Sequence, residues 1–386
     1  PLSWREINWA FHSNSQDILI DVVNKQFHGR TIWENARERG MFMWISDATA
    51  LVSYPFHYYQ DSTYLLQKSQ FEIIARNEYT KSDEKNPIDC SLYYLALKKK
   101  TVPQGLWRMA GWNREQTATM KLLSNNFSDP KWRTTALKNA YALLGKHRFE
   151  YAAAFFLLAD SLKDAVNVCL NQLRDIQLAI AICRVYEGDK GPVLKELLEE
   201  KILPLAAAEG NRWLASWAFW MLHRRDMSVR ALISPVYTLL ETPSSPDMQA
   251  KLYLTDDPAL IILYAQLRQK TLQTLRGASK VTPRTEWAFV IHSARLYDRM
   301  GCDILALDLV RNWEFLLTVD QPLKPLEEAH PKHLLRRRSS LVVNDLPERL
   351  KDFLPEAPPS PGKAKKKAPT QFVEPESSSL LDSFGF

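Results

Sequence analysis

The residues that could carry out acid–base, nucleophilic or metal chemistry are scattered through this 386-residue chain. Two of the eight histidines, His330 and His333, lie close together, but no further ligand accompanies them, so we expect solvated side chains there and no metal site. The sequence contains no glycine-rich phosphate loop, no G-x-S-x-G and no H-E-x-x-H. We therefore expect a protein that is not an enzyme and that holds no metal and no cofactor.

The four cysteines are also dispersed and form no C-x-x-C pair. Cys169 and Cys183 fall on apolar faces of predicted helices, where a free cysteine packs as a small hydrophobic side chain. So few cysteines in a long chain suit a reducing compartment. We expect buried, inert thiols.

One candidate for covalent chemistry lies towards the C-terminus. Residues 336–340 read RRRSS, a form that basophilic kinases accept, so Ser339 is a candidate phosphosite. A phosphate there would cancel part of the basic run. A second basic run, 363–367, suits a nuclear address or contact with anionic lipid headgroups, although a solvated linker is the more common case.

Two short apolar segments interrupt the polar C-terminal region, at 346–354 and 379–386. The second carries large apolar side chains that are costly to leave in water, namely Leu380, Leu381, Phe384 and Phe386. We interpret it as a short docking motif that becomes ordered when it binds a partner.

Tryptophans and lysines supply the other candidate partner-binding residues. Trp213, Trp217 and Trp220 follow helical spacing, which usually marks a core; the alternative is an exposed groove, because Trp and Arg dominate interface hot spots. Three consecutive lysines end another predicted helix: Lys98, Lys99 and Lys100. They either stabilise the negative end of that helix or bind an acidic patch on a partner.

The elements that must position these residues are clearest at 136–188, where four helix signals follow one another with short connections. Gly145 stands where a left-handed helix stop is expected. Ser161 and Asp164 form a predicted capping box, and Asp175 caps the fourth helix, which ends at Gly188.

The fourth of these helices has apolar residues on two sides, so it must be covered on two sides. Short helices of this kind, joined by tight turns and stacked side by side, form an α-solenoid. We therefore predict an all-α fold, an irregular α-solenoid of helical hairpins over residues 1–320.

Caps and prolines place further helices along the chain. Ser3 with Glu6 and Thr31 with Glu34 are predicted capping boxes, and the pair Asn86-Pro87 marks a helix start. Residues 52–70 show the weakest periodicity and contain Pro55, so we expect a loop or insertion there. After residue 188 the helical pattern continues over 193–201, 212–224, 258–276, 283–299 and 303–317, and we see no convincing strand.

The composition changes near residue 320. Ten of the 22 prolines lie in 321–386, together with the basic runs and a serine-rich acidic stretch. Such a segment cannot bury enough apolar surface to offset its ordering entropy, so we expect a mostly disordered tail.

Charge and hydropathy exclude two classes of function. The net charge of +6 is spread too evenly to indicate nucleic-acid binding, and no run of 18 apolar residues could span a membrane. The chain begins with Pro1 in a helical pattern, so we expect it to be a piece of a longer protein.

Longer stretches resemble one known family. Residues 132–169 (WRTTALKNAYALLGKHRFEYAAAFFLLADSLKDAVNVC) are similar to the C-terminal region of the large subunit of the RAVE complex, a family that includes DmX and the alpha subunit of rabconnectin-3. Residues 71–100, 105–112 and 125–133 fit the same pattern, and the terminal SSSLLDSFGF looks fungal. The resemblance covers 31–317 except 52–70, whose length does not match the family.

This resemblance implies a large cytosolic scaffold with β-propellers ahead of an α-solenoid, which assembles the vacuolar-type proton ATPase (V-ATPase). Its expected partners are the peripheral-stalk and C components of that ATPase and the other RAVE subunits. Membrane association would be indirect, through recruitment to vacuolar or endosomal membranes, and no catalytic residues carry over. The alternative is a vesicle-coat or tethering scaffold, because propeller-plus-solenoid chains also build coats.

Overall fold

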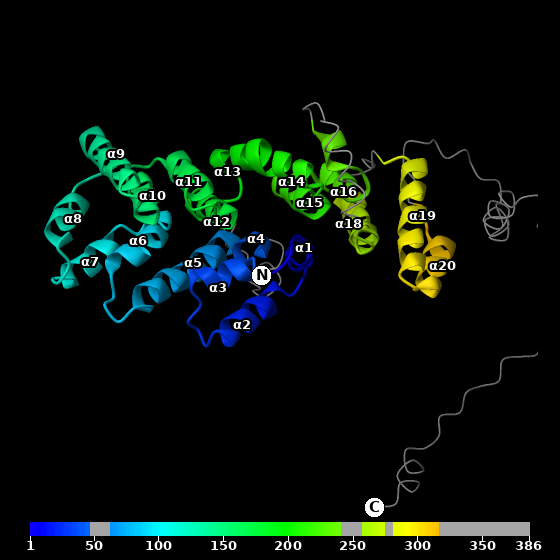
Figure 1. Ribbon diagram of the computed structural model, residues 1–386, viewed down its shortest axis with the longest axis horizontal. Helices are drawn as coiled ribbons and strands as arrows, with labels where there is room; N and C mark the ends of the chain where they lie inside the picture. The colour runs from blue at the N-terminus through cyan, green and yellow to red at the C-terminus, as the bar shows by residue number, and fades with distance from the viewer. Residues whose placement is uncertain (47–61, 241–256, 275–280, 316–386) are drawn as a thin grey trace, which may run out of the picture. The chain divides into compact units, whose positions relative to one another are not determined.

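The computed structural model describes residues 1–46, 62–240, 257–274 and 281–315, and within these ranges every regular element is a helix. All of them belong to one compact unit that spans Pro1–Asp320 (Figure 1). The all-α prediction is confirmed for this part of the chain. The predicted disordered tail at 321–386, its apolar segments at 346–354 and 379–386, Ser339, and the docking residues Leu380, Leu381, Phe384 and Phe386 all lie outside the described residues.

The N-terminal helices are short except for the last. They are α1 (Trp4–Phe11), α2 (Gln16–Gln26), α3 (Trp33–Glu38), α4 (Met41–Trp44) and α5 (Ser62–Thr80). The predicted box at Ser3 is confirmed, because its side chain accepts from the Glu6 N–H while the Glu6 carboxylate accepts from the Ser3 N–H. The capping box predicted at Thr31 does not form, because the Thr31 side chain is buried and α3 begins only at Trp33.

The prediction of a loop or insertion over residues 52–70 is corrected by helix α5. It begins at Ser62, so the latter part of the stretch expected to be a loop is helical, and residues 47–61 lie outside the described ones. Pro55 precedes this helix and therefore does not interrupt it. The turns of α5 near Phe71, Ile74 and Ala75 are buried, so tertiary packing supplies what the weak sequence periodicity does not show.

The next helices stack as consecutive neighbours. They are α6 (Pro87–Ala96), α7 (Thr101–Met109), α8 (Gln116–Leu123), α9 (Pro130–Gly145), α10 (Phe149–Leu158), α11 (Leu162–Asn171) and α12 (Ile176–Tyr186). Helix α9 packs against α10, α10 against α11 and α11 against α12, as Figure 1 shows, and α6 packs against both α5 and α10. This is the predicted arrangement of helical hairpins.

Helix ends in this region follow the expected chemistry with two exceptions. Asn86 and Asp175 accept backbone N–H bonds as N-caps, and Gly188 adopts a positive φ after α12. Gly145, however, is the last residue of α9, and the left-handed conformation falls on His147 instead. The capping box predicted at α11 is wrong, because the Ser161 hydroxyl bonds the Asp164 carboxylate instead of its N–H, and the Ser161 N–H donates to the Phe156 carbonyl.

The C-terminal half of the unit contains α13 (Pro192–Leu197), a π-helical turn (Leu198–Ile202), α14 (Leu203–Glu209), α15 (Arg212–Met221), α16 (Arg225–Ile233), a 3₁₀ turn (Val236–Leu239), α18 (Leu260–Thr274), α19 (Pro283–Arg299) and α20 (Asp303–Asn312). The predicted helix 193–201 is therefore interrupted by the π turn. Pro204 follows this turn, and the wider helical turn suits a residue that lacks an N–H donor.

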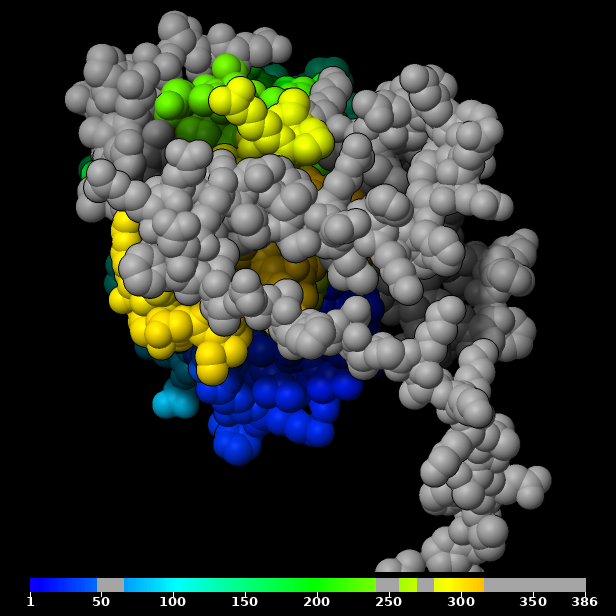
Figure 2. Space-filling view, turned by 90° about the vertical axis from the view of Figure 1, so that its right-hand side faces the viewer, coloured from blue at the N-terminus to red at the C-terminus, as the bar shows by residue number. Residues whose placement is uncertain are grey.

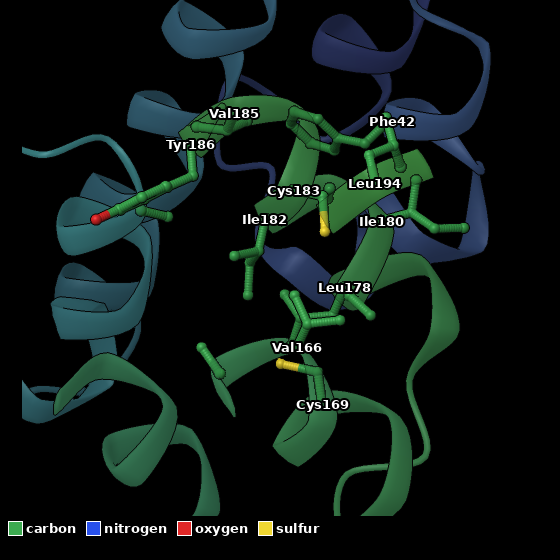
Figure 3. Packing of buried hydrophobic residues seen from close by; sticks show 14 of the residues in the cluster. Phe42, Val166, Cys169, Leu178, Ile180, Ile182, Cys183, Val185, Tyr186 and Leu194 are labelled. Atoms are coloured by element: carbon green, nitrogen blue, oxygen red, sulfur yellow. The ribbon is translucent and has the colours of Figure 1, made fainter. Parts of the chain in front are cut away.

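Helix α12 is buried along most of its length. Leu178 points towards Val166 and Cys169 of α11, whereas Ile180 points towards Phe42 of α4 and Leu194 of α13 (Figure 3). These side chains are at most 3% exposed, and α12 packs against α4, α5, α6, α11 and α13. The prediction that this helix is covered on two sides is confirmed.

Helix α4 is tied to the middle of the stack through its carbonyl groups. The last carbonyls of a helix have no partner within it, and here each receives a side-chain donor. Arg184 of α12 donates to the carbonyls of Phe42 and Ile45, and Trp217 of α15 donates to that of Met43 at 2.9 Å. Gln16 donates to the Trp44 carbonyl at 2.7 Å. These bonds fix the N-terminal helices against α12 and α15.

Candidate partner-binding surfaces

The tryptophan stripe of α15 lies in a seam against the N-terminal helices. Trp217 is fully buried, and its ring lies 5.3 Å from that of Trp4. Trp213 is 7% exposed, whereas Trp220 is half-buried between the His12 ring at 4.7 Å and the guanidinium of Arg225 at 5.2 Å. The structure favours the core interpretation for Trp213 and Trp217, because both side chains are buried.

The three consecutive lysines each contact a different element of the same chain. Lys98 holds its ammonium 4.1 Å from the centre of the Tyr186 ring of α12. Lys99 forms an ion pair of 2.6 Å with Glu72 of α5, and Lys100 donates to the Asn125 carbonyl at 2.7 Å. The lysines thus fasten the end of α6 to its neighbours, although Lys98 and Lys99 remain exposed.

The last helical hairpin presents an apolar surface that the sequence pattern does not single out. Helix α20 packs against α19 but buries none of its residues. Met300, Ile304, Leu305 and Leu307 are between 55% and 84% exposed. Figure 2 shows atoms of this hairpin, in yellow and orange, at the surface. The spacing of these residues is visible in the sequence, but a helical apolar stripe normally indicates a core.

A negatively charged pocket of about 440 Å³ lies where three helix starts meet the end of α5. Its carboxylates come from Glu34 of α3, Glu78 of α5, Asp89 of α6 and Glu150 of α10. Three of them stand in the first turn of a helix, where acidic residues are common because they offset the helix dipole. Nothing in the sequence therefore marks them as a group.

Three of the four cysteines are buried as the sequence predicts, whereas Cys302 is only half-buried. Cys90, Cys169 and Cys183 are fully buried, which raises the pKa of each thiol, that of Cys90 to about 12. They stay protonated at neutral pH and are poor nucleophiles. Among the described residues no group of three histidine, cysteine, aspartate or glutamate side chains could hold a metal ion. No helix in the same ranges has the length and apolar character needed to cross a bilayer.

Comparison with known proteins identifies the family. The family model described as RAVE protein 1 C terminal matches residues 1–309. The chain belongs to this family. The match includes α1 to α19 and most of α20, so it covers nearly all of the helical unit described above. The sequence resemblance to the large subunit of the RAVE complex is confirmed.

Similar curated proteins occur in fungi and mammals. The chain is 40% identical over 331 residues to "Regulator of V-ATPase in vacuolar membrane protein 1" of Saccharomyces cerevisiae, covering 85% of this chain and 23% of that protein. It is 39% identical over 339 residues to the protein of the same name in Schizosaccharomyces pombe, covering 81% and 24%. "DmX-like protein 1" of Mus musculus is 30% identical over 343 residues, covering 80% and 10%. The chain thus spans about a quarter of the length of the fungal relatives.

Proposed function

We propose that this member of the RAVE protein 1 C-terminal family is a non-enzymatic scaffold that binds V-ATPase subunits and promotes reassembly of the catalytic sector with the membrane sector. The family match over residues 1–309 is the observation that carries the proposal. The names of both fungal relatives, which describe regulators of the V-ATPase in the vacuolar membrane, support it.

The proposed mechanism is templating. Two parts held on one frame meet at a high effective concentration and in a fixed relative orientation. The bonds from Arg184 and Trp217 to α4 support such a frame, because they couple helices that are far apart in sequence. Its action would be one of binding, in keeping with relatives named as regulators.

The proposed partners are the peripheral-stalk and C components of the V-ATPase, together with the other RAVE subunits. On this proposal the protein is cytoplasmic and reaches vacuolar or endosomal membranes through the ATPase. The vacuolar membrane in the names of the fungal relatives supports that location.

A capture experiment tests the proposal. The full chain is immobilised and exposed to fungal cytosol under conditions in which the catalytic sector is detached, and the bound proteins are identified by mass spectrometry. We expect the peripheral-stalk and C components to be enriched over a resin carrying an unrelated helical protein of similar net charge. Capture of coat components or cargo tails without ATPase subunits, with self-assembly of the chain in size-exclusion chromatography, would support the coat alternative instead.

A further inference from the structure

The pocket between α3, α5, α6 and α10 carries an excess of negative charge on a chain whose net charge is +6. Its two cationic lining residues are already engaged at the rim. Arg37 lies 3.5 Å from Asp175, and Lys81 lies 3.8 Å from Glu78. Both are exposed, so solvent weakens these pairs. The carboxylates of the pocket are therefore only partly compensated.

Three of the four pocket carboxylates, those of Glu34, Asp89 and Glu150, have no hydrogen-bond or ion-pair partner among the described residues. Asp89 and Glu150 form no side-chain hydrogen bond or ion pair within the described part of the chain, whereas Glu78 accepts the Trp33 backbone N–H at 2.8 Å. Partial burial raises the pKa of Glu78, Asp89 and Glu150, and for Glu150 the neighbouring charges of Glu78 and Asp89 add to the effect. The pKa of Glu150 is raised even though Glu150 is exposed to solvent at the pocket wall. The positive ends of α6 and α10 offset these charges only in part.

A tyrosine hydroxyl that bonds no other group of the described chain also lines the pocket. Tyr93 is only 3% exposed and lines the pocket, where the charges of Glu78 and Glu150 act on its hydroxyl. Polar groups in such sheltered positions nearly always have a partner in a native structure, so this hydroxyl is suited to bond a ligand or water. Burial raises the pKa of Tyr93 well above its ordinary value, so it remains a neutral donor and acceptor.

The side chains of Trp33 and Tyr93 also line the pocket, with 7% and 3% of their surfaces exposed. The indole of Trp33 is held by its Nε1–H, which donates to Asp175 at 2.9 Å, and its ring centre lies 6.4 Å from that of Tyr93. Aromatic faces and carboxylates together attract organic cations, the rings through their quadrupoles and the carboxylates through charge. A volume of about 440 Å³ falls in the range of sites for organic groups, about 300–1,000 Å³, rather than single ions.

We propose that this pocket receives an arginine or lysine side chain of a partner protein, with Asp89 and Glu150 as the charged acceptors and Trp33 and Tyr93 as the aromatic walls. A guanidinium could bond both carboxylates, and the Tyr93 hydroxyl could accept a further donor. This inference deepens the proposed scaffold function, on which it rests, by naming the chemistry of one partner contact.

Peptide binding to the full chain tests the inference. Fluorescent hexa-arginine is titrated in low salt against hexa-citrulline, which has the same shape without the charge. We expect only hexa-arginine to bind, and the double variant Asp89→Asn, Glu150→Gln to weaken its binding at least tenfold. The matched control Glu209→Gln, which removes an exposed carboxylate at the end of α14, should change the affinity less than twofold. Melting temperatures no lower than that of the wild type would show that all variants are folded.

Three outcomes would overturn the inference. They are equal binding of both peptides, equal affinity in wild type and double variant, and spermine binding that exceeds peptide binding and assigns the pocket to free amines. The capture experiment with V-ATPase subunits, repeated with the double variant, separates the two proposals. Loss of peptide binding with unchanged capture supports the pocket as the site of another partner contact. Failure of capture with retained peptide binding counts against the scaffold function alone.

Discussion

Arg184 joins three parts of the molecule through one guanidinium. It is fully buried, bonds the carbonyls of Phe42 and Ile45, and pairs with Asp189 through Nε at 2.6 Å and Nη2 at 2.9 Å. The planar fork of arginine can serve all these acceptors together, whereas an ammonium group is a single point. A buried arginine of this kind therefore acts as a structural tie.

We expect Arg184→Lys to lower the free energy of unfolding by about 2–5 kcal/mol, because at least one buried carbonyl would lose its donor. Urea denaturation followed by circular dichroism measures the change. The control Arg295→Lys, at an exposed position on α19, should stay within about 0.5 kcal/mol of wild type. Equal urea midpoints for both variants would contradict the structural role of Arg184.

Glu150 should make the folded state less stable as pH rises. Its pKa is raised in the folded protein, so in the window above the ordinary carboxyl pKa the folded state holds more protons than the unfolded state. Stability then falls as pH increases through that window. The charged groups that face Glu150 across the pocket are Glu34, Arg37, Glu78, Lys81 and Asp89.

We therefore expect Glu150→Gln to raise the melting temperature by about 2 °C at pH 7.5, an amount typical of one exposed charge. The gain should shrink towards pH 4.5, where the wild-type carboxyl takes up a proton. Differential scanning calorimetry at the two pH values measures this difference, with Glu209→Gln as the control. A lower melting temperature than wild type at both pH values would show that Glu150 is not repelled in its pocket.

Among the elements, α10 should be the most sensitive to truncation of its side chains. Phe156 is 1% exposed and packs edge-on against Tyr141 of α9 at 5.0 Å. Removing its ring leaves a cavity between adjacent hairpins. We expect Phe156→Ala to cost about 3–5 kcal/mol in urea denaturation. Trp112→Ala, which truncates a larger ring that is 53% exposed, should cost about 0.5 kcal/mol or less. The reverse order would mean that α10 turns its aromatic face outward.

Element starts were largely predictable from the sequence, because caps act locally. Asn86 accepts an N–H in the first turn and a proline follows it, as expected, and Thr282 does the same at the start of α19. Element ends and interruptions were less predictable. The π turn at Leu198–Ile202 and the left-handed His147 depend on how neighbouring helices pack, which no short motif encodes.

The candidate sites were less predictable than the fold. Helical spacing marked the Trp217 stripe, but the same spacing serves both a core and a groove, and only the position of α1 decides between them. The pocket carboxylates of Glu78, Asp89 and Glu150 come from three helices that meet only in the folded chain. The buried Arg184 gave no signal because arginine is usually exposed.

For the whole molecule, the sequence predicts that the helical unit provides the folded structure and that the C-terminal region provides a docking motif. We expect deletion of residues 379–386 to leave the melting temperature unchanged and to reduce capture of V-ATPase subunits at least threefold. The reason is that a short apolar motif adds binding free energy without contributing to the fold. The matched control replaces the same residues with a glycine–serine segment of equal length. Capture that is the same with and without the motif would show that it does not dock the ATPase.

The side-chain bonds to α4 have a consequence for how the chain comes apart. In a simple repeat array each unit contacts only its neighbours, so a terminal unit can fray or be clipped while the others stay intact. Here the carbonyls of α4 are held by Arg184 and Trp217, more than a hundred residues further along the chain. A protease that removed the first helices would leave the buried Arg184 guanidinium and the Trp217 indole N–H without their acceptors. Loss of the amino-terminal helices should therefore destabilise α12 and α15 as well, and the helical unit should unfold cooperatively.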